Sequence, residues 1–239
     1  MPVREQLLEY RDGDALLEGL FCYDDALPGP LPAVLISHEW GGRGELVEKK
    51  ARRLAARGYA TFALDMFGKG KRGTTTEECQ ALITPFVQDR ALLARRINAA
   101  LSFVRTLPQV DARRVAAMGF CFGGMCVLDL ARSGADVRGV VSFHGLLKPN
   151  GLPPAKSIPA KILMLHGWDD PLAPPEDVLA ISKEFTDAKV DWQLHAYGGT
   201  MHSFTNPNAN NPEAGMVFSD KAQRRSWHSL MEFLEEVLR

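Results

Sequence analysis

From residue 33 onward, short apolar runs alternate with segments in which apolar residues recur every three or four positions. The runs are typical of buried strands and the segments of amphipathic helices. Alternation of this kind predicts the α/β class, with a mostly parallel twisted sheet and helices on both of its faces. The expected strands are Ala33–His38, Tyr59–Leu64, Arg114–Met118, Val137–Phe143, Ile162–His166 and Trp192–Ala196.

Two more strands, Leu7–Tyr10 and Leu16–Tyr23, precede this pattern and predict an antiparallel hairpin across Asp12-Gly13-Asp14. No repeat or linker-like shift in composition divides the chain, so we expect one domain over residues 1–239. The expected helices are Glu45–Arg57, one long helical region ending near Leu107, Phe122–Arg132, Glu176–Ala188 and a C-terminal helix that buries Trp227 and Leu234.

The charge balance excludes several classes of partner. Lys and Arg number 28 and Asp and Glu 29, a net charge of −1, which gives no electrostatic reason to bind nucleic acid or an anionic membrane.

No apolar run approaches the ~20 residues that span a bilayer, and the N-terminus lacks the apolar centre of a secretory signal. The four cysteines have neither zinc-site nor disulfide-framework spacing. We expect a cytoplasmic protein with free thiols and no metal or cofactor, as a monomer or homodimer.

A nucleophile is expected at Cys121. The strand Arg114–Met118 runs into Gly119-Phe120-Cys121-Phe122-Gly123, and a helix follows. This is the arrangement of a nucleophile elbow, in which side chains two positions either side of the nucleophile would collide with neighbouring backbone. The helix N-terminus favours a thiolate and can hold a developing oxyanion. The alternative is a buried structural cysteine, which is the interpretation we favour for Cys126.

An acid and a base follow in the order that nucleophilic hydrolysis requires. Asp169 and Asp170 come directly after the strand Ile162–His166, and Asp170 has the better spacing from the preceding glycine, although Asp169 stays open. His202 lies on a loop after the last strand, near two glycines. The order of nucleophile, acid and histidine is that of α/β-hydrolases.

Four motifs together give the chain a resemblance to the dienelactone hydrolase family over nearly its whole length. They are His38-Glu39-Trp40-Gly41-Gly42, Gly119–Gly124, His166–Pro171 and Gly199–Phe204. The resemblance implies the α/β-hydrolase fold and hydrolysis of small esters or lactones through a thioester. It also implies Cys121, Asp170 and His202 as the catalytic triad.

The same resemblance implies roles for three further residues. Glu39 would contact the resting cysteine and assist its activation when substrate binds. A glutamate can take the thiol proton if burial raises its own pKa. The backbone N–H groups of Trp40 and Phe122 would form the oxyanion hole.

The chain departs from the family at two positions. Lys69 and Asn206 stand where members that degrade chlorocatechols hold the substrate carboxylate with arginines. A lysine cannot reproduce a bidentate arginine contact, so uncharged esters should suit the site better than dienelactone itself. The resemblance also extends to broad-substrate members, some of which attack phosphotriesters as a side activity. The expected partners are therefore small esters, lactones or organophosphates.

Several residues are expected around the substrate. The candidate apolar walls are Trp40, Phe67, Trp168 and Phe204, although any of these aromatic residues could equally belong to the core. His144 could line the pocket, and residues 205–215 could form its rim. The basic residues near Lys69 could be either a solvated loop or a residual attraction for anions.

Three rival functions remain. Gly42-Arg43-Gly44 imitates a nicotinamide-binding fingerprint, but Val47 replaces its third glycine. His38-Glu39 begins like a zinc-binding H-E-x-x-H motif, but Gly42 replaces the second histidine. A non-catalytic thiol redox sensor or binding protein on the same fold is the third alternative.

Overall fold

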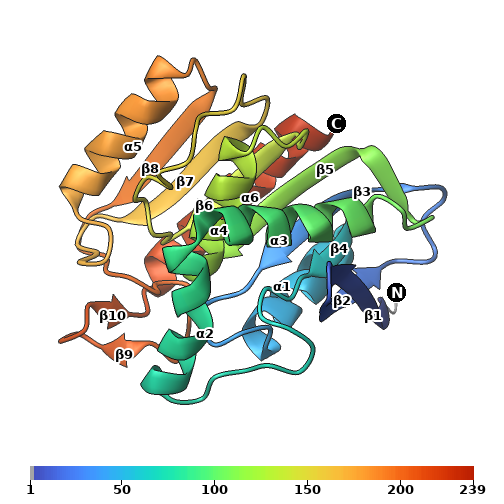
Figure 1. The fold of residues 1–239 in the computed structure, drawn as a ribbon, viewed down its shortest axis with the longest axis horizontal. Coiled ribbons are helices and arrows are strands. Elements are labelled where there is room, and N and C mark those ends of the chain that lie inside the picture. The colour runs from blue at the N-terminus through green and yellow to red at the C-terminus, as the bar shows by residue number, and fades with distance from the viewer. Residues whose placement is uncertain (1–2) are drawn as a thin grey trace.

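The computed structural model describes residues 3–239, which build one eight-stranded sheet (Figure 1). Its strands are β1 (Arg4–Asp12), β2 (Ala15–Tyr23), β3 (Leu31–Ser37), β4 (Ala60–Ala63), β5 (Val110–Phe120), β6 (Gly139–Phe143), β7 (Lys161–Gly167) and β8 (Trp192–Tyr197). They lie in the order β1-β2-β4-β3-β5-β6-β7-β8. Neighbours from β4 to β8 are parallel, and β2 pairs antiparallel with both β1 and β4. The predicted fold class and N-terminal hairpin are confirmed.

Helices cover both faces of the sheet. One face carries α1 (Glu45–Ala55) and α6 (Asp220–Leu238), and the other carries α3 (Arg90–Val104), α4 (Phe122–Arg132) and α5 (Pro175–Asp187). This double cover explains why the central strands are continuous apolar runs, since a strand that is buried on both faces has no side for polar residues. Within residues 3–239, no helix is both long and apolar enough to cross a membrane.

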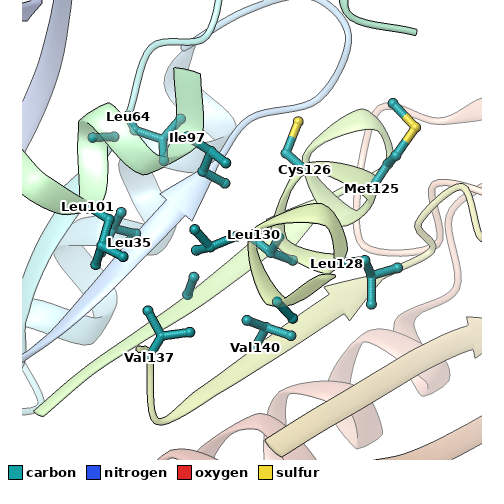
Figure 2. Close-up of a cluster of buried hydrophobic side chains, with 14 of the residues drawn as sticks. Leu35, Leu64, Ile97, Leu101, Met125, Cys126, Leu128, Leu130, Val137 and Val140 are labelled. Atoms are coloured by element: carbon teal, nitrogen blue, oxygen red, sulfur yellow. The ribbon is translucent and has the colours of Figure 1, made fainter. Parts of the chain in front are cut away.

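Large aliphatic side chains fill the space between the sheet and α3 and α4. Figure 2 shows this layer, in which Leu35 of β3 and Val140 of β6 face Ile97 and Leu101 of α3 and Leu130 of α4. All five residues are almost completely buried. Burying each such side chain stabilises the fold by about 1.5–3 kcal/mol, so this layer holds the central strands in place.

The long helical region expected before Leu107 is two helices, α2 (Thr76–Gln88) and α3. Asp89 separates them, because its backbone is extended and its carboxylate accepts a hydrogen bond from the N–H of Leu92 at 2.9 Å. An aspartate in this position caps a new helix. The break lets α3 pack along the sheet while α2 turns away toward the end where the strands finish (Figure 1).

A second small hairpin was not expected from the sequence. It pairs β9 (Asn210–Asn211) with β10 (Met216–Val217) and lies at the same end of the molecule as α2 (Figure 1). Strands of two residues are too short to show a hydrophobic period. Because parallel strands all point the same way, the carboxyl ends of β3 and β5 to β8 open toward this end as well.

The buried layer generates a stability prediction. Leu35→Ala should lower the free energy of unfolding by about 2–5 kcal/mol, because it removes buried contacts and leaves a cavity. Leu179→Ala is the matched control, because its side chain is 70% exposed, and it should change stability by less than about 0.5 kcal/mol. Urea unfolding measures both. Equal effects of the two substitutions would contradict this description of the core.

Candidate active site

Cys121 occupies a sharp turn between β5 and α4. Its backbone has φ of +55° and ψ of −116°, a conformation that non-glycine residues rarely adopt. The Cys121 N–H donates to the carbonyl of Phe143 at 3.0 Å, which ties the turn to the end of β6. Such strained positions persist only where the surroundings hold them, and they concentrate at functional sites.

Two glycines make the turn possible because other backbone lies against them. A Cβ on Gly119 would come within 2.0 Å of the Gly123 carbonyl oxygen, and a Cβ on Gly123 within 2.4 Å of the Ser37 carbonyl oxygen. Backbone atoms of this kind cannot move aside for a side chain. The turn therefore holds Cys121 at the N-terminus of α4, close to the end of β3.

His202 and Asp170 form a buried hydrogen-bonded pair. Nδ1 of His202 lies 2.7 Å from Oδ2 of Asp170, and both side chains are at most 1% exposed. The other oxygen of Asp170 accepts from the N–H of Leu172 at 2.8 Å. Asp169 is exposed, and only its backbone N–H approaches this loop, donating to the Thr200 carbonyl. Of the two aspartates left open by the sequence, Asp170 is the one that contacts His202.

The electrostatics of this pair favour a protonated His202. Burial alone would lower its pKa, but the negative charges of Cys121 and Asp170, with the hydrogen bond between Asp170 and Nδ1, outweigh burial and raise the pKa to about 10. Nε2 of His202 is buried and has no hydrogen-bond partner among residues 3–239. This nitrogen is therefore available to exchange a proton with a group in the neighbouring cavity.

Glu39 enters the same region from the end of β3. Its Oε2 accepts from Nδ2 of Asn206 at 3.4 Å, whereas its Oε1 is buried and unpaired among residues 3–239. Burial raises the pKa of Glu39, and the nearby charges of His202 and Lys50 together with the Asn206 contact only partly oppose it, leaving the pKa at about 7. Near neutral pH this carboxyl group can therefore take up or release a proton.

A cavity of about 550 Å³ joins these groups. Cys121, His202, Glu39 and Asn206 all line it, and so do Trp40 and Phe122, whose backbone N–H groups donate to no atom of residues 3–239. We refer to it as the Cys121 cavity. Its apolar lining comes from Trp40, Ile83, Phe122, Leu146, Leu172, Ala209, Ala214 and Met216, and its polar lining includes Gln80 and four asparagines between Asn206 and Asn211.

Comparison with known proteins assigns the family. The sequence model of the dienelactone hydrolase family matches residues 18–238, which are almost the entire chain. The chain belongs to the dienelactone hydrolase family. The resemblance inferred from the four motifs is therefore confirmed, and so is the assignment of this chain as a hydrolase of the dienelactone type.

Individual relatives agree with the family. A dienelactone hydrolase-like promiscuous phosphotriesterase from metagenomic libraries is 36% identical, with a TM-score of 0.96 and full coverage of both chains. The structure named m3DLH is 35% identical, with a TM-score of 0.92 and 99% coverage of each chain. An uncharacterized protein of Caenorhabditis elegans is 37% identical over 148 residues, which are 61% of this chain and 94% of that protein.

Most of the substrate-binding residues expected from the sequence lie outside the cavity of this hydrolase. Lys69 forms ion pairs with Glu9 and Glu18 beside the N-terminal hairpin, and its side chain is 44% exposed. Trp168 is also exposed, with its ring turned to His166. Neither residue lines the Cys121 cavity. The loops that carry these side chains direct them elsewhere.

Two of the expected aromatic walls belong to the core. Phe67 packs between His38, Phe86 and Phe122, and Phe204 is completely buried against Tyr197. His144 packs against the ring of His202 and does not line the cavity. Asn206, by contrast, was expected to bind substrate and does line it. The core alternative is the correct one for Phe67 and Phe204, whereas Trp168 is exposed and Trp40 lines the Cys121 cavity.

The sequence analysis missed residues that do line the cavity. Ile83 belongs to α2, and Leu172 follows Pro171 in the loop after β7. Met216 comes from the β9–β10 hairpin, which bonds directly to His202 because the His202 N–H donates to the Gly215 carbonyl at 2.8 Å. Ile83 could have been found from the apolar stripe of α2, but nothing local distinguishes the other two from ordinary loop residues.

His38 has a local structural role. Its Nε2 accepts from the Met66 N–H at 3.1 Å, and its Nδ1 lies 2.6 Å from the Glu39 carbonyl oxygen. These contacts connect the ends of β3 and β4. Within the described residues, no group of three or more His, Cys, Asp or Glu side chains could hold a metal ion.

The raised pKa of Glu39 makes stability depend on pH. The folded chain holds the Glu39 proton up to about pH 7, whereas the ordinary pKa of a glutamate is 4.5. The unfolded chain therefore releases the proton first, and the free energy of unfolding of the wild type decreases as the pH rises through this interval. Glu39→Gln carries no such proton. Compared with wild type, the Gln variant should gain at least about 1 kcal/mol between pH 5 and pH 8, measured by urea unfolding.

Glu45→Gln is the matched control, because its side chain is 64% exposed at the start of α1. The stability of this variant should run parallel to that of wild type over the same range. A Glu39→Gln difference that does not change with pH would show that Glu39 is not held protonated by burial.

Proposed function

We propose that this protein cleaves small uncharged esters and lactones through a Cys121, His202 and Asp170 triad and a thioester intermediate. The observation that supports it most is the buried Asp170–His202 pair at 2.7 Å, in a site whose cavity is lined by both Cys121 and His202. Asp170 would hold the imidazole orientation and stabilise its cation, as in other acyl-transfer triads.

In the first half of the reaction, the Cys121 sulfur attacks the carbonyl carbon of the ester and the C=O electron pair moves onto oxygen. The resulting oxyanion accepts hydrogen bonds from the Trp40 and Phe122 N–H groups, which have no competing partner among residues 3–239. The C–O bond then breaks, and His202 gives its Nε2 proton to the departing alkoxide. The acyl group is left on sulfur as a thioester.

In the second half, His202 takes a proton from water, and the hydroxide attacks the thioester carbon. The C–S bond breaks, the electron pair returns to sulfur, and the carboxylic acid leaves. Glu39 serves the resting enzyme in this proposal. With a pKa of about 7 and an unpaired oxygen beside the cavity, it can accept the proton of the Cys121 thiol.

The charges around the Cys121 cavity define the substrate class. None of the residues that line it is a lysine or arginine, while Glu39 contributes a carboxyl group. The His202 cation that lines the cavity is already paired with Asp170, so a substrate carboxylate would lose its hydration without gaining an unpaired cationic partner. We propose uncharged esters and lactones with an apolar body that fits against residues such as Ile83 and Leu146.

A phosphotriester is the second candidate substrate. The metagenomic relative described as a promiscuous phosphotriesterase covers the whole chain at 36% identity. Phosphotriesters are also uncharged, so the same cavity suits them. The Cys121 sulfur would attack phosphorus and expel an aryloxide, which takes the Nε2 proton of His202, while the Trp40 and Phe122 N–H groups would hold the phosphoryl oxygen. Water, deprotonated by His202, would then attack phosphorus, break the P–S bond and release the phosphodiester.

The nature of the nucleophile suggests where the protein acts. A thiol must stay reduced to attack a substrate, and all four cysteines are free in the structure. We therefore propose the cytoplasm, which keeps thiols reduced, as its location.

Replacement of the nucleophile tests the proposed chemistry. Cys121→Ala should lower kcat/KM for 4-nitrophenyl butyrate and for paraoxon more than about a thousandfold, because triad deletions remove the covalent path. Cys22→Ala is the matched control, a buried cysteine on β2 that does not line the cavity, and should retain activity. Release of 4-nitrophenolate measures both reactions. If Cys121→Ala keeps activity within about tenfold for the ester, Cys121 is not its nucleophile.

A pair of substrates of similar size tests the charge preference. Wild type should hydrolyse 4-nitrophenyl butyrate at least about tenfold more efficiently than 4-nitrophenyl hemisuccinate, which carries a carboxylate. Asn206→Arg adds a cation to the cavity lining and should reduce this ratio. Lys69→Ala is the control, because Lys69 lies outside the cavity, and should leave the ratio unchanged. An equal preference of wild type for both substrates would refute the proposed substrate class.

A further inference from the structure

His144 is a completely buried histidine at the end of β6, and the mechanism above does not use it. Its φ is +37°, so its backbone is strained in the region that favours glycine. The His144 N–H donates to the Leu165 carbonyl at 2.9 Å, which fixes this strained residue against the end of β7. A side chain held so firmly beside a candidate active site requires an explanation.

The loop that carries His202 folds around the ring of His144. The centroids of the His144 and His202 rings are 5.1 Å apart with an interplanar angle of 66°. The centroid of the Phe204 ring is also 5.1 Å from that of His144, with an interplanar angle of 83°. Nε2 of His144 lies 2.8 Å from Oγ1 of Thr205. Three of the four residues from His202 to Thr205 therefore contact one imidazole ring.

His144 does not line the Cys121 cavity, so it does not meet the substrate there. Its ring stays neutral, because burial and the nearby charge of His202 lower the pKa of His144 well below its ordinary value. The other titratable groups that act on these two histidines come from different elements. They are Cys121 before α4, Glu39 after β3, Lys50 of α1, His166 of β7 and Asp170 after β7.

We propose that His144 is a positioning residue that holds the ring of His202 toward Cys121 and stabilises its protonated form. An aromatic ring in edge-to-face contact restricts its neighbour, and a neutral ring attracts a cation where a second cation would repel it. The Thr205 contact fixes the orientation of the His144 ring. This inference rests on the proposed triad, since it assigns His202 the acid–base role.

Two variants separate the ring of His144 from its polar nitrogen. His144→Gln removes the ring but keeps a polar group that can reach Thr205. The double variant His144→Phe with Thr205→Val keeps an aromatic ring and removes both polar partners together, so it leaves no unpaired hydroxyl. His195→Gln is the matched control, because His195 also bonds a hydroxyl, Ser229 at 3.0 Å, but on the sheet edge at β8.

The variants should differ in kcat rather than KM for 4-nitrophenyl butyrate. His144→Gln should lower kcat about tenfold, because a misdirected acid–base group loses part of its contribution. It should also move the basic limb of the pH–rate profile, and the NMR titration of His202, down by about half a pH unit or more. The double variant should restore kcat to within about threefold of wild type, and His195→Gln should change neither quantity.

Each outcome bears on the proposal separately from the triad. Unchanged kcat and pH profile in His144→Gln, while Cys121→Ala is inactive, would overturn the role of His144 and leave the triad standing. A double variant as impaired as His144→Gln would also overturn it, because the ring would not be what matters. If His144→Gln does not fold, Thr205→Val alone should lower kcat about threefold with an unchanged melting temperature, and full activity would refute the proposal.

Discussion

The strained turn at Cys121 is the constraint on which the rest of the site depends. It exists because Gly119 and Gly123 let the backbones of β5, α4 and β3 approach more closely than any side chain would allow. This approach places Cys121 at a helix N-terminus and in the same cavity as Glu39, which lies two residues after the end of β3. The parallel order of the strands then brings Asp170 after β7 and His202 after β8 to the same end.

Burial gives each ionisable group of the site a different character. It raises the pKa of Glu39 and lowers that of His144, because both groups lose water without gaining a strong opposite charge. His202 is equally buried, but the charges of Cys121 and Asp170 outweigh the loss of water and favour its cation. One apolar environment thus holds a neutral histidine directly against a histidine that prefers to be charged.

Sequence reasoning reached the residues at strand ends and the rim at residues 205–215, part of which lines the cavity, but few of the other side chains around it. The positions of Cys121, Asp170 and His202 follow from glycine spacing and chain order, since loops that follow buried parallel strands lie at the carboxyl edge of the sheet. The prediction that Lys69 and Trp168 line the cavity was wrong, because both lie on loops, where the direction of a side chain depends on the residues that it contacts. Lys69 forms ion pairs with Glu9 and Glu18 of the hairpin, and these contacts hold its side chain there.

The sequence by itself determined the α/β class, the antiparallel hairpin, the family, and the positions of Cys121, His202 and the Asp169-Asp170 pair along the chain. These follow from local periods and motifs, which a linear pattern can carry. Only the tertiary structure decided between Asp169 and Asp170, assembled a cavity without lysine or arginine, and packed His144 against His202. Those results depend on contacts between distant segments, and their energies arise from burial and distance that no local pattern encodes.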